Sequence, residues 1–136
     1  MTKNQKIYLA GIIDGEGYIG ISHFKRKDGR KFYKARIIVS NCNLGLLEYI
    51  KSFTGGYITK KSIGKKHWTQ GYNLTLTYYN DWFYQVVPYL YGKRKKAELF
   101  LEAIKLLNKR GFKDREKKYK RIEEINQLLR KKEWEV

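Results

Sequence analysis

Two carboxylates, Asp14 and Glu16, directly follow an apolar segment at residues 7–13. Acidic side chains at the C-terminus of a helix oppose its macrodipole, and a cation bound between them would relieve their mutual repulsion. Ligands that are all oxygen suit a hard ion such as Mg²⁺. The pattern therefore predicts a divalent-metal site at the end of a helix, with a solvated C-terminal turn as the alternative.

The helix expected to carry these acids spans about residues 4–15, with Asn4 or Thr2 as its cap and the glycines after Ile13 ending it. Ala10 and Gly11 are small residues inside an otherwise apolar helix. A glycine at such a position costs about 1 kcal/mol relative to alanine. Close approach of another helix backbone is the natural compensation, as in other helix contacts made by small residues.

Other chemistry is poorly supported by the residue types. The two histidines, His23 and His67, lie far apart and have no partners at metal-ligand spacing, which argues against a zinc site. The one cysteine, Cys42, cannot form a disulfide within the chain and is expected to be a small buried residue. These counts fit a reducing, intracellular setting, cytoplasmic or organellar.

Hydrophobic periodicity indicates which elements must position the acids. Strands are expected at about 18–25, 31–40, 57–61 and 70–78, and further helices at about 44–53, 81–87, 93–111 and 114–132. Asp28-Gly29 is typical of a hairpin turn, Asn43 of a helix cap, and Pro88 of a helix break. The order α-β-β-α-β-β-α-α-α predicts an α+β fold, one domain over residues 1–136, with an antiparallel sheet and helices on one of its faces. A C-terminal helical extension is expected at about 112–134.

The strands alternate clearly between apolar and polar residues. Tyr33, Ala35, Ile37 and Val39 should face the core, with Lys34, Arg36 and Ile38 on the other face. In the second hairpin, Leu74 should face the core and Asn73 and Thr75 should not. The non-core face is rich in cations and nearly free of acids, which favours a binding surface over ordinary solvation.

The charge balance points to the class of partner. The chain has 30 Lys and Arg against 13 Asp and Glu, a net charge of +17. Such an excess favours nucleic acid, through neutralised phosphates and released counterions, although a ribosomal or membrane-surface protein would share it. We expect neither a membrane span nor a signal peptide.

The nine residues Leu9-Ala10-Gly11-Ile12-Ile13-Asp14-Gly15-Glu16-Gly17 resemble the signature of the LAGLIDADG homing endonucleases, with mild departures at 12, 15 and 16. The resemblance extends over about Ile7–Leu106. It implies the αββαββα fold of that family, in which the sheet forms a DNA-binding saddle. Because the motif occurs once, it also implies a homodimer that meets through the motif helix, at Leu9, Ala10, Gly11, Ile13 and Asp14.

The resemblance also implies roles for site residues. Glu16 would bind the catalytic metal together with the Gly15 carbonyl, and Asp14 less so. Asn41 would hold solvent near the metal, and Lys93 would act near the scissile phosphate. The metal would be Mg²⁺ or Mn²⁺, with Ca²⁺ able to bind without supporting cleavage. The alternative for Lys93 is that residues 93–96 are a solvated basic run, although four cations at a helix start oppose its dipole.

The implied activity is site-specific, metal-dependent cleavage of both strands of a long, roughly palindromic DNA site by an intron-encoded enzyme. A two-stranded ribbon fits the major groove, and the strand phase could be displaced by one residue. The candidate DNA-reading residues are Ser22, Phe24, Arg26, Lys34, Arg36, Ile38, Thr59, Lys61, Gln70, Asn73 and Thr75. An RNA-binding intron maturase and a non-catalytic DNA-binding regulator are the alternatives, so RNA stays open as a partner.

Overall fold

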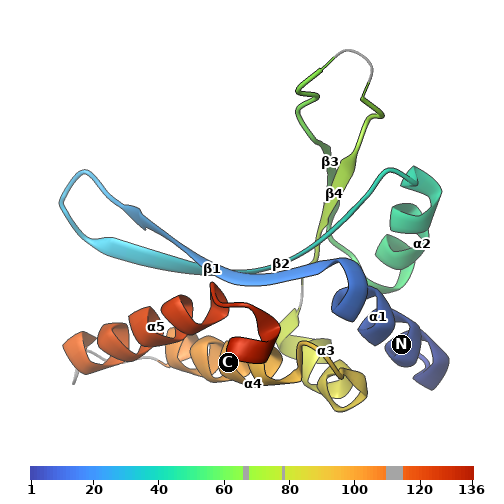
Figure 1. Ribbon diagram of the computed structural model, residues 1–136. Helices are drawn as coiled ribbons and strands as arrows, with labels where there is room; N and C mark the ends of the chain where they lie inside the picture. The colour runs from blue at the N-terminus through green and yellow to red at the C-terminus, as the bar shows by residue number, and fades with distance from the viewer. Residues whose placement is uncertain (66–67, 78, 110–114) are drawn as a thin grey trace. The chain divides into compact units, whose positions relative to one another are not determined.

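A computed structural model describes residues 1–65, 68–77, 79–109 and 115–136 (Figure 1). Its helices are α1 (Lys3–Glu16), α2 (Leu44–Thr54), α3 (Tyr79–Val86), α4 (Arg94–Asn108) and α5 (Arg115–Leu129), with 3-10 turns η1 (Val87–Tyr89) and η2 (Glu133–Glu135). The strands are β1 (Gly17–Lys25), β2 (Lys31–Asn41), β3 (Tyr57–Lys60) and β4 (Tyr72–Thr75). They form one antiparallel sheet in the order β1-β2-β4-β3. The α+β class and the element order predicted from the sequence are confirmed, whereas the predicted helix ends at Gly111 and Asp114 lie outside the described residues.

The chain divides into two compact units. The first comprises Met1–Tyr18 and Ile37–Tyr91, and the second comprises Ile19–Arg36 and Gly92–Val136. The long strands β1 and β2 therefore contribute one end to each unit.

Helix α1 of the first unit is set by its caps. Thr2 Oγ1 accepts from the Gln5 amide at 3.1 Å while Gln5 Oε1 accepts from the Thr2 amide at 2.8 Å, a capping box. The helix does not stop at Gly15, as expected from the sequence, but continues through Glu16 to a C-cap at Gly17. A Cβ at Gly17 would lie 2.7 Å from both Cα and O of Ile13, so only glycine lets β1 leave the helix so closely.

The rest of the first unit encloses a core against this helix. Helix α1 packs against α3 and η1, and α2 packs against β3 and β4. Asn43 caps α2 as predicted, accepting from the Leu46 amide at 3.1 Å. Pro88 lies in η1, where α3 ends. The buried side chains are those of Leu9, Ala10, Ile13, Ile37, Val39, Leu47, Ile50, Leu74, Leu76, Trp82, Phe83, Val86, Val87 and Leu90.

Strand β4 is shorter than the predicted 70–78, since regular pairing covers only Tyr72–Thr75. Its register places Leu74 opposite Val39 and Asn73 opposite Ser40. The predicted alternation is confirmed here, because Leu74 is buried and its neighbours Asn73 and Thr75 are not.

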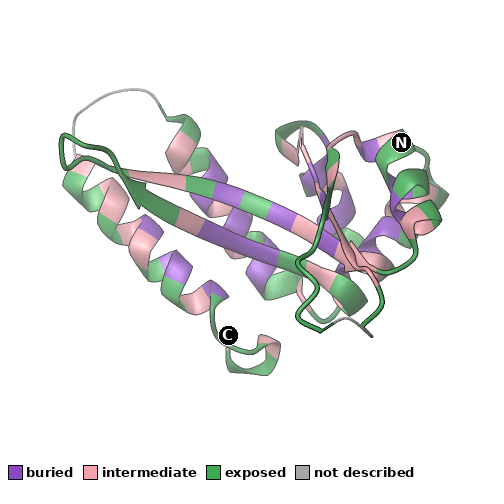
Figure 2. Cartoon of the chain, turned by 90° about the horizontal axis from the view of Figure 1, so that it is seen from above, coloured by how far each residue is buried: buried purple, intermediate pink, exposed green. Residues whose placement is uncertain are grey.

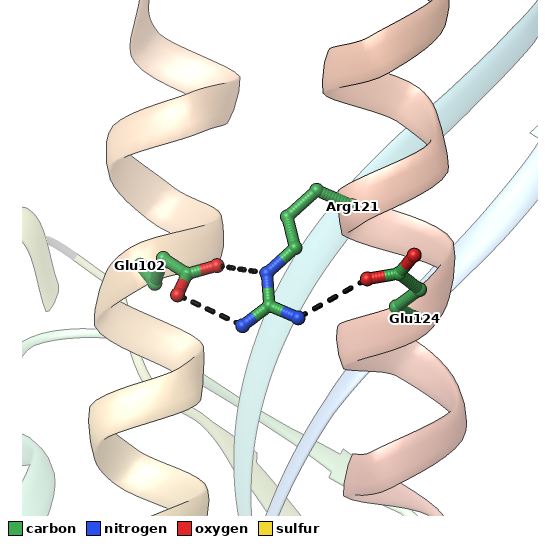
Figure 3. A network of polar contacts seen from close by, with 3 residues as sticks. All are labelled: Glu102, Arg121 and Glu124. Atoms are coloured by element: carbon green, nitrogen blue, oxygen red, sulfur yellow. Dashed lines mark hydrogen bonds and ion pairs between the residues drawn. The ribbon is translucent and has the colours of Figure 1, made fainter.

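In the second unit, α4 and α5 lie along one face of the hairpin formed by β1 and β2 (Figures 1 and 2). Gly29 has a φ of 84° in the turn, which suits the predicted Asp-Gly pair. The core consists of Ile19, Ile21, Ala35, Ala97, Phe100, Ala103, Ile104, Ile122, Ile125 and Leu129. The guanidinium of Arg121 joins the two helices: its Nε and Nη2 donate to Glu102 at 2.6 and 3.0 Å, and its Nη1 to Glu124 at 3.2 Å (Figure 3).

The predicted phase of β2 is also confirmed. Ala35, Ile37 and Val39 are buried, whereas Lys34 and Arg36 are exposed. The Tyr33 hydroxyl donates to Glu123 of α5 at 3.2 Å, so this side chain points toward the helices. Burial, followed by the hydrogen bond to the Glu123 carboxylate, raises the pKa of Tyr33.

Candidate functional site

Glu16 ends helix α1 with an exposed carboxylate held in one orientation. Asn41, the last residue of β2, donates from Nδ2 to Glu16 Oε2 at 2.8 Å. The other end of the Asn41 amide is also bonded, because its Oδ1 accepts from the Asn43 amide at 2.7 Å. Asn41 thus links the acid to the N-terminus of α2, and the predicted pair of Glu16 and Asn41 does come together in space.

The Asp14 carboxylate, unlike that of Glu16, is bonded to the backbone of a distant segment. Its Oδ2 accepts from the backbone amide of Tyr91 at 2.8 Å, which ties the segment after η1 to the C-terminal turn of α1. Asp14 is half-buried and Glu16 is exposed. A carboxylate that satisfies a backbone amide within the chain serves packing, whereas Glu16 presents oxygen to the outside.

The end of α1 offers only part of a metal site. The last carbonyls of a helix lack partners within it, so the Gly15 carbonyl and the Glu16 carboxylate are adjacent oxygen ligands of the kind that Mg²⁺ takes. Gly15 is exposed, and a Cβ there would meet nothing within 4 Å. Among the described residues, no three His, Cys, Asp or Glu side chains converge as a metal site. The oxygens at the end of α1 are nevertheless of the type that a hard cation binds.

Helix α1 has one buried and one exposed stripe. Leu9, Ala10 and Ile13 are fully buried in the core of their own chain. This corrects the interface expected from the sequence, since these three expose no surface to a second copy. The helix is apolar all round between residues 7 and 13, so its sequence does not indicate which side faces the core.

The exposed stripe contains the glycines. Ile7 and Tyr8 are 46% and 39% exposed, and Gly11 follows on the same side of the helix, with nothing within 4 Å of a Cβ added there. Gly15 continues this line one turn later. The outer surface of α1 is thus apolar at Ile7 and Tyr8 and is bare backbone at Gly11 and Gly15, next to Glu16.

Lys93 belongs to the second unit and is the N-cap residue of α4. Its Nζ lies 3.7 Å from Glu133 Oε1, and Lys96 Nζ lies 3.7 Å from the same oxygen. Both side chains are largely covered and both ammonium groups are paired with Glu133, so Lys93 and Lys96 do not belong to a freely solvated basic run. Arg94 and Lys95, between them, are exposed.

The DNA-reading residues expected in the second unit lie on the hairpin face away from α4 and α5. Lys34 and Arg36 are exposed there, and Ser22 Oγ donates to the Lys34 carbonyl at 3.4 Å. Near the turn, Phe24 stacks on Phe32 with ring centroids 5.7 Å apart. The Arg26 guanidinium lies 3.8 Å from the centroid of the Phe32 ring.

The residues expected in the first unit divide into two groups. Ile38, Asn73, Thr75 and Thr59 occupy cross-strand positions on the non-core face, because Thr75 pairs with Ile38 and Asn73 with Thr59. Asn73 Oδ1 also accepts from Ser40 Oγ at 2.5 Å.

Lys61 and Gln70, by contrast, lie outside the strands. The Gln70 amide donates to the carbonyls of Lys61 and Gly71 at 2.8 and 2.7 Å and closes the base of the loop. The sequence placed both in strands because the hydrophobic alternation extends beyond the paired residues.

Charge is segregated along the chain. None of the four strands that the structure describes contains Asp or Glu, and no acid occurs between Glu48 and Asp81. The strands carry Lys25, Lys31, Lys34, Arg36 and Lys60. A strand surface of this kind attracts phosphate and repels no part of a polyanion.

Three residues that contact the expected site residues could not be found from the motif: Glu133, Ser40 and Phe32. Glu133 was overlooked because it lies in the C-terminal segment, which no motif covers. Ser40 and Phe32 have the same strand parity as Lys34 and Arg36. The alternation of side chains along β2 could therefore have placed both residues on the non-core face.

No helix among the described residues is long and apolar enough to cross a membrane. The family model for LAGLIDADG endonucleases matches residues 9–100. We found no match among curated proteins.

Solved structures share the fold. An archaeal intron-encoded homing endonuclease, I-Vdi141I complexed with DNA, is 20% identical with a TM-score of 0.73, over 93% of this chain and 82% of that one. The homing endonuclease I-CvuI, in complex with I-CreI target in the presence of 2 mM Mg, is 19% identical with a TM-score of 0.71, over 93% and 80%. I-CvuI in complex with its own target and 2 mM Ca is 22% identical with a TM-score of 0.70, over 93% and 82%.

Proposed function

Because the chain belongs to the LAGLIDADG endonuclease family, we propose that it is a homing endonuclease that cuts both strands of a long, roughly palindromic DNA site in a metal-dependent reaction. The observation that carries this proposal is the exposed Glu16 carboxylate, oriented by Asn41 at the end of a helix that exposes the backbone of Gly11 and Gly15 beside it. A solvated helix terminus would need neither the amide that holds the acid nor the glycines beside it.

DNA would be bound by the sheet. The exposed Lys34 and Arg36 and the polar pair Ser40 and Asn73 present donors on the non-core face of β2 and β4. A two-stranded ribbon can enter the major groove, where Arg and Lys suit guanine and Asn suits adenine. The absence of acids from the described strands removes the repulsion that such an approach would otherwise meet.

Cleavage would depend on three side chains. Glu16 and the Gly15 carbonyl would hold Mg²⁺ or Mn²⁺, which when bound supplies charge at the scissile phosphate and lowers the pKa of water. Asn41 keeps the Glu16 carboxylate in place, and the second N–H of its side-chain amide would orient solvent. Lys93, assigned by its resemblance to a family lysine, would stabilise the negative charge that develops on the phosphate.

The enzyme would work as a homodimer, because one chain contains the motif once. Close packing of two α1 helices at Gly11 would bring two copies of Glu16 together, one for each DNA strand. The similar structures solved with DNA in the presence of Mg or Ca support a divalent metal. An intron as the source of the gene would agree with the archaeal homing endonuclease I-Vdi141I, which is intron-encoded and has a similar structure.

Glu16→Gln tests the function. The carboxamide keeps the shape of the side chain and loses the charge that holds metal, so the variant should bind a site selected from a randomised DNA library and not cut it. Glu48→Gln, at an exposed acid of α2, is the matched control and should cut like the wild type. Cleavage by Glu16→Gln within a few-fold of the wild type would refute the metal-ligand role. Binding of the library without any cleavage by the wild type would indicate a DNA-binding regulator instead.

A further inference from the structure

Glu133, in the C-terminal turn η2, makes two ion pairs with the start of α4. The same oxygen, Oε1, lies 3.7 Å from Nζ of both Lys93 and Lys96. The side chains of the two lysines are 13% and 11% exposed, and that of Glu133 is 35% exposed. One carboxylate therefore pairs with the ammonium groups of two largely covered lysine side chains, and the three groups together have a net charge of +1.

This arrangement addresses an electrostatic problem of α4. Four consecutive cations occupy residues 93–96 at the positive end of the helix dipole. Without a carboxylate, the covered Lys93 and Lys96 would repel each other and the helix terminus. Glu133 offsets all three interactions from a single position.

The C-terminal segment is held in place from both sides of this contact. Before it, Arg121 fastens α5 to α4 through Glu102 (Figure 3). After it, Lys95 Nζ donates to the Val136 carbonyl at 3.1 Å. Within it, the Glu135 amide donates to the Lys132 carbonyl at 2.9 Å and closes the turn. The position of Glu133 is thus set by contacts other than its own.

We propose that Glu133 is a positioning residue for Lys93: the C-terminal turn holds the Lys93 ammonium in place for the reaction, so the extension is part of the catalytic apparatus. The proposal rests on the proposed function, in which Lys93 acts on the scissile phosphate.

The ionisation of Glu133 agrees with this role. A hydrogen bond from its own backbone amide, followed by the charges of Lys96 and Lys93, holds the pKa of Glu133 below its usual range, although desolvation acts in the opposite direction. The carboxylate is therefore ionised at neutral pH.

The test compares single-turnover cleavage of saturated, library-selected DNA. Glu133→Gln alone leaves a covered Lys96 unpaired, so we remove that cation as well in Glu133→Gln/Lys96→Met. This variant should cleave about tenfold more slowly than the wild type, because the ion pair that holds the Lys93 ammonium in place is lost. Lys96→Met alone keeps the ion pair between Glu133 and Lys93, so this variant should cleave at the wild-type rate. Glu135→Gln, at an exposed acid of the same turn, is the matched charge control.

A double-mutant cycle separates positioning from a structural role. In a Lys93→Ala background, adding Glu133→Gln/Lys96→Met should not slow cleavage further, because the group being positioned is absent. Equal slowing in both backgrounds, or an unchanged or faster rate in the double variant, would overturn the proposal. If Lys93→Ala itself cleaves like the wild type, the proposal fails together with the assigned role of Lys93, whereas a wild type that cuts no DNA refutes the proposed function first.

Discussion

Replacing Gly11 by alanine should stabilise a single chain and at the same time weaken its self-association. Gly11 lies inside α1 and is exposed, and a Cβ added there would meet nothing within 4 Å beyond the helix's own nearby backbone. The substitution thus meets no steric obstacle within the chain. It should gain the helix-propensity difference of about 1 kcal/mol, because glycine loses more backbone entropy on folding.

The opposite effect is expected between two chains. If two α1 helices approach closely at Gly11, one methyl group enters the contact from each copy. Overpacking of a close contact costs about 1–3 kcal/mol, so the dissociation constant of the dimer should rise by about tenfold to a hundredfold or more.

Urea unfolding over a hundredfold range of protein concentration resolves the two effects. The midpoint of a dimer depends on concentration, because association stabilises the folded state by mass action. The wild type should show this dependence. Gly11→Ala should show less of it, with a higher midpoint than the wild type at the lowest concentration. An unchanged dependence would refute close packing at Gly11, and a lower midpoint at every concentration would show that a group of the same chain occupies this side of α1.

Two further predictions concern specificity and stability. Arg36→Ala should cost about 1–3 kcal/mol at one base-pair position and relax the preference there in a library selection, since Arg36 is exposed on the non-core face of β2; a uniform loss for all sequences, with a salt slope lower by about one, would make Arg36 a phosphate contact. Asn126→Leu should raise the free energy of unfolding by about 1 kcal/mol, because Asn126 is 1% exposed and its Nδ2 has no hydrogen-bond partner in the described part of the chain; a loss of stability in thermal or urea unfolding would mean that this amide is satisfied.

Local interactions account for what could be predicted from the sequence. The caps at Thr2 and Asn43, the turn at Gly29 and the break at Pro88 each depend on residues within a few positions of one another. The strand phase follows from alternation, which a sheet with one buried face imposes on every strand. The acidic residues at the end of α1 and the family resemblance could also be recognised, because the motif is contiguous.

The contacts around the site were decided only by the tertiary structure. Asn41 meets Glu16 across 25 positions, and Tyr91 meets Asp14 across 77. Neither pair leaves a periodic signal in the sequence. The buried stripe of α1 and the partnership of Glu133 with Lys93 likewise depend on which elements pack together. Residues between 7 and 13 are apolar on all sides of the helix, so the hydrophobic pattern does not show which side is buried. A run of basic residues has the same sequence whether its side chains are solvated or paired with acids, so charge alone does not identify the partners. Packing selects one face of a helix and one partner for a charge, and this selection requires the whole chain.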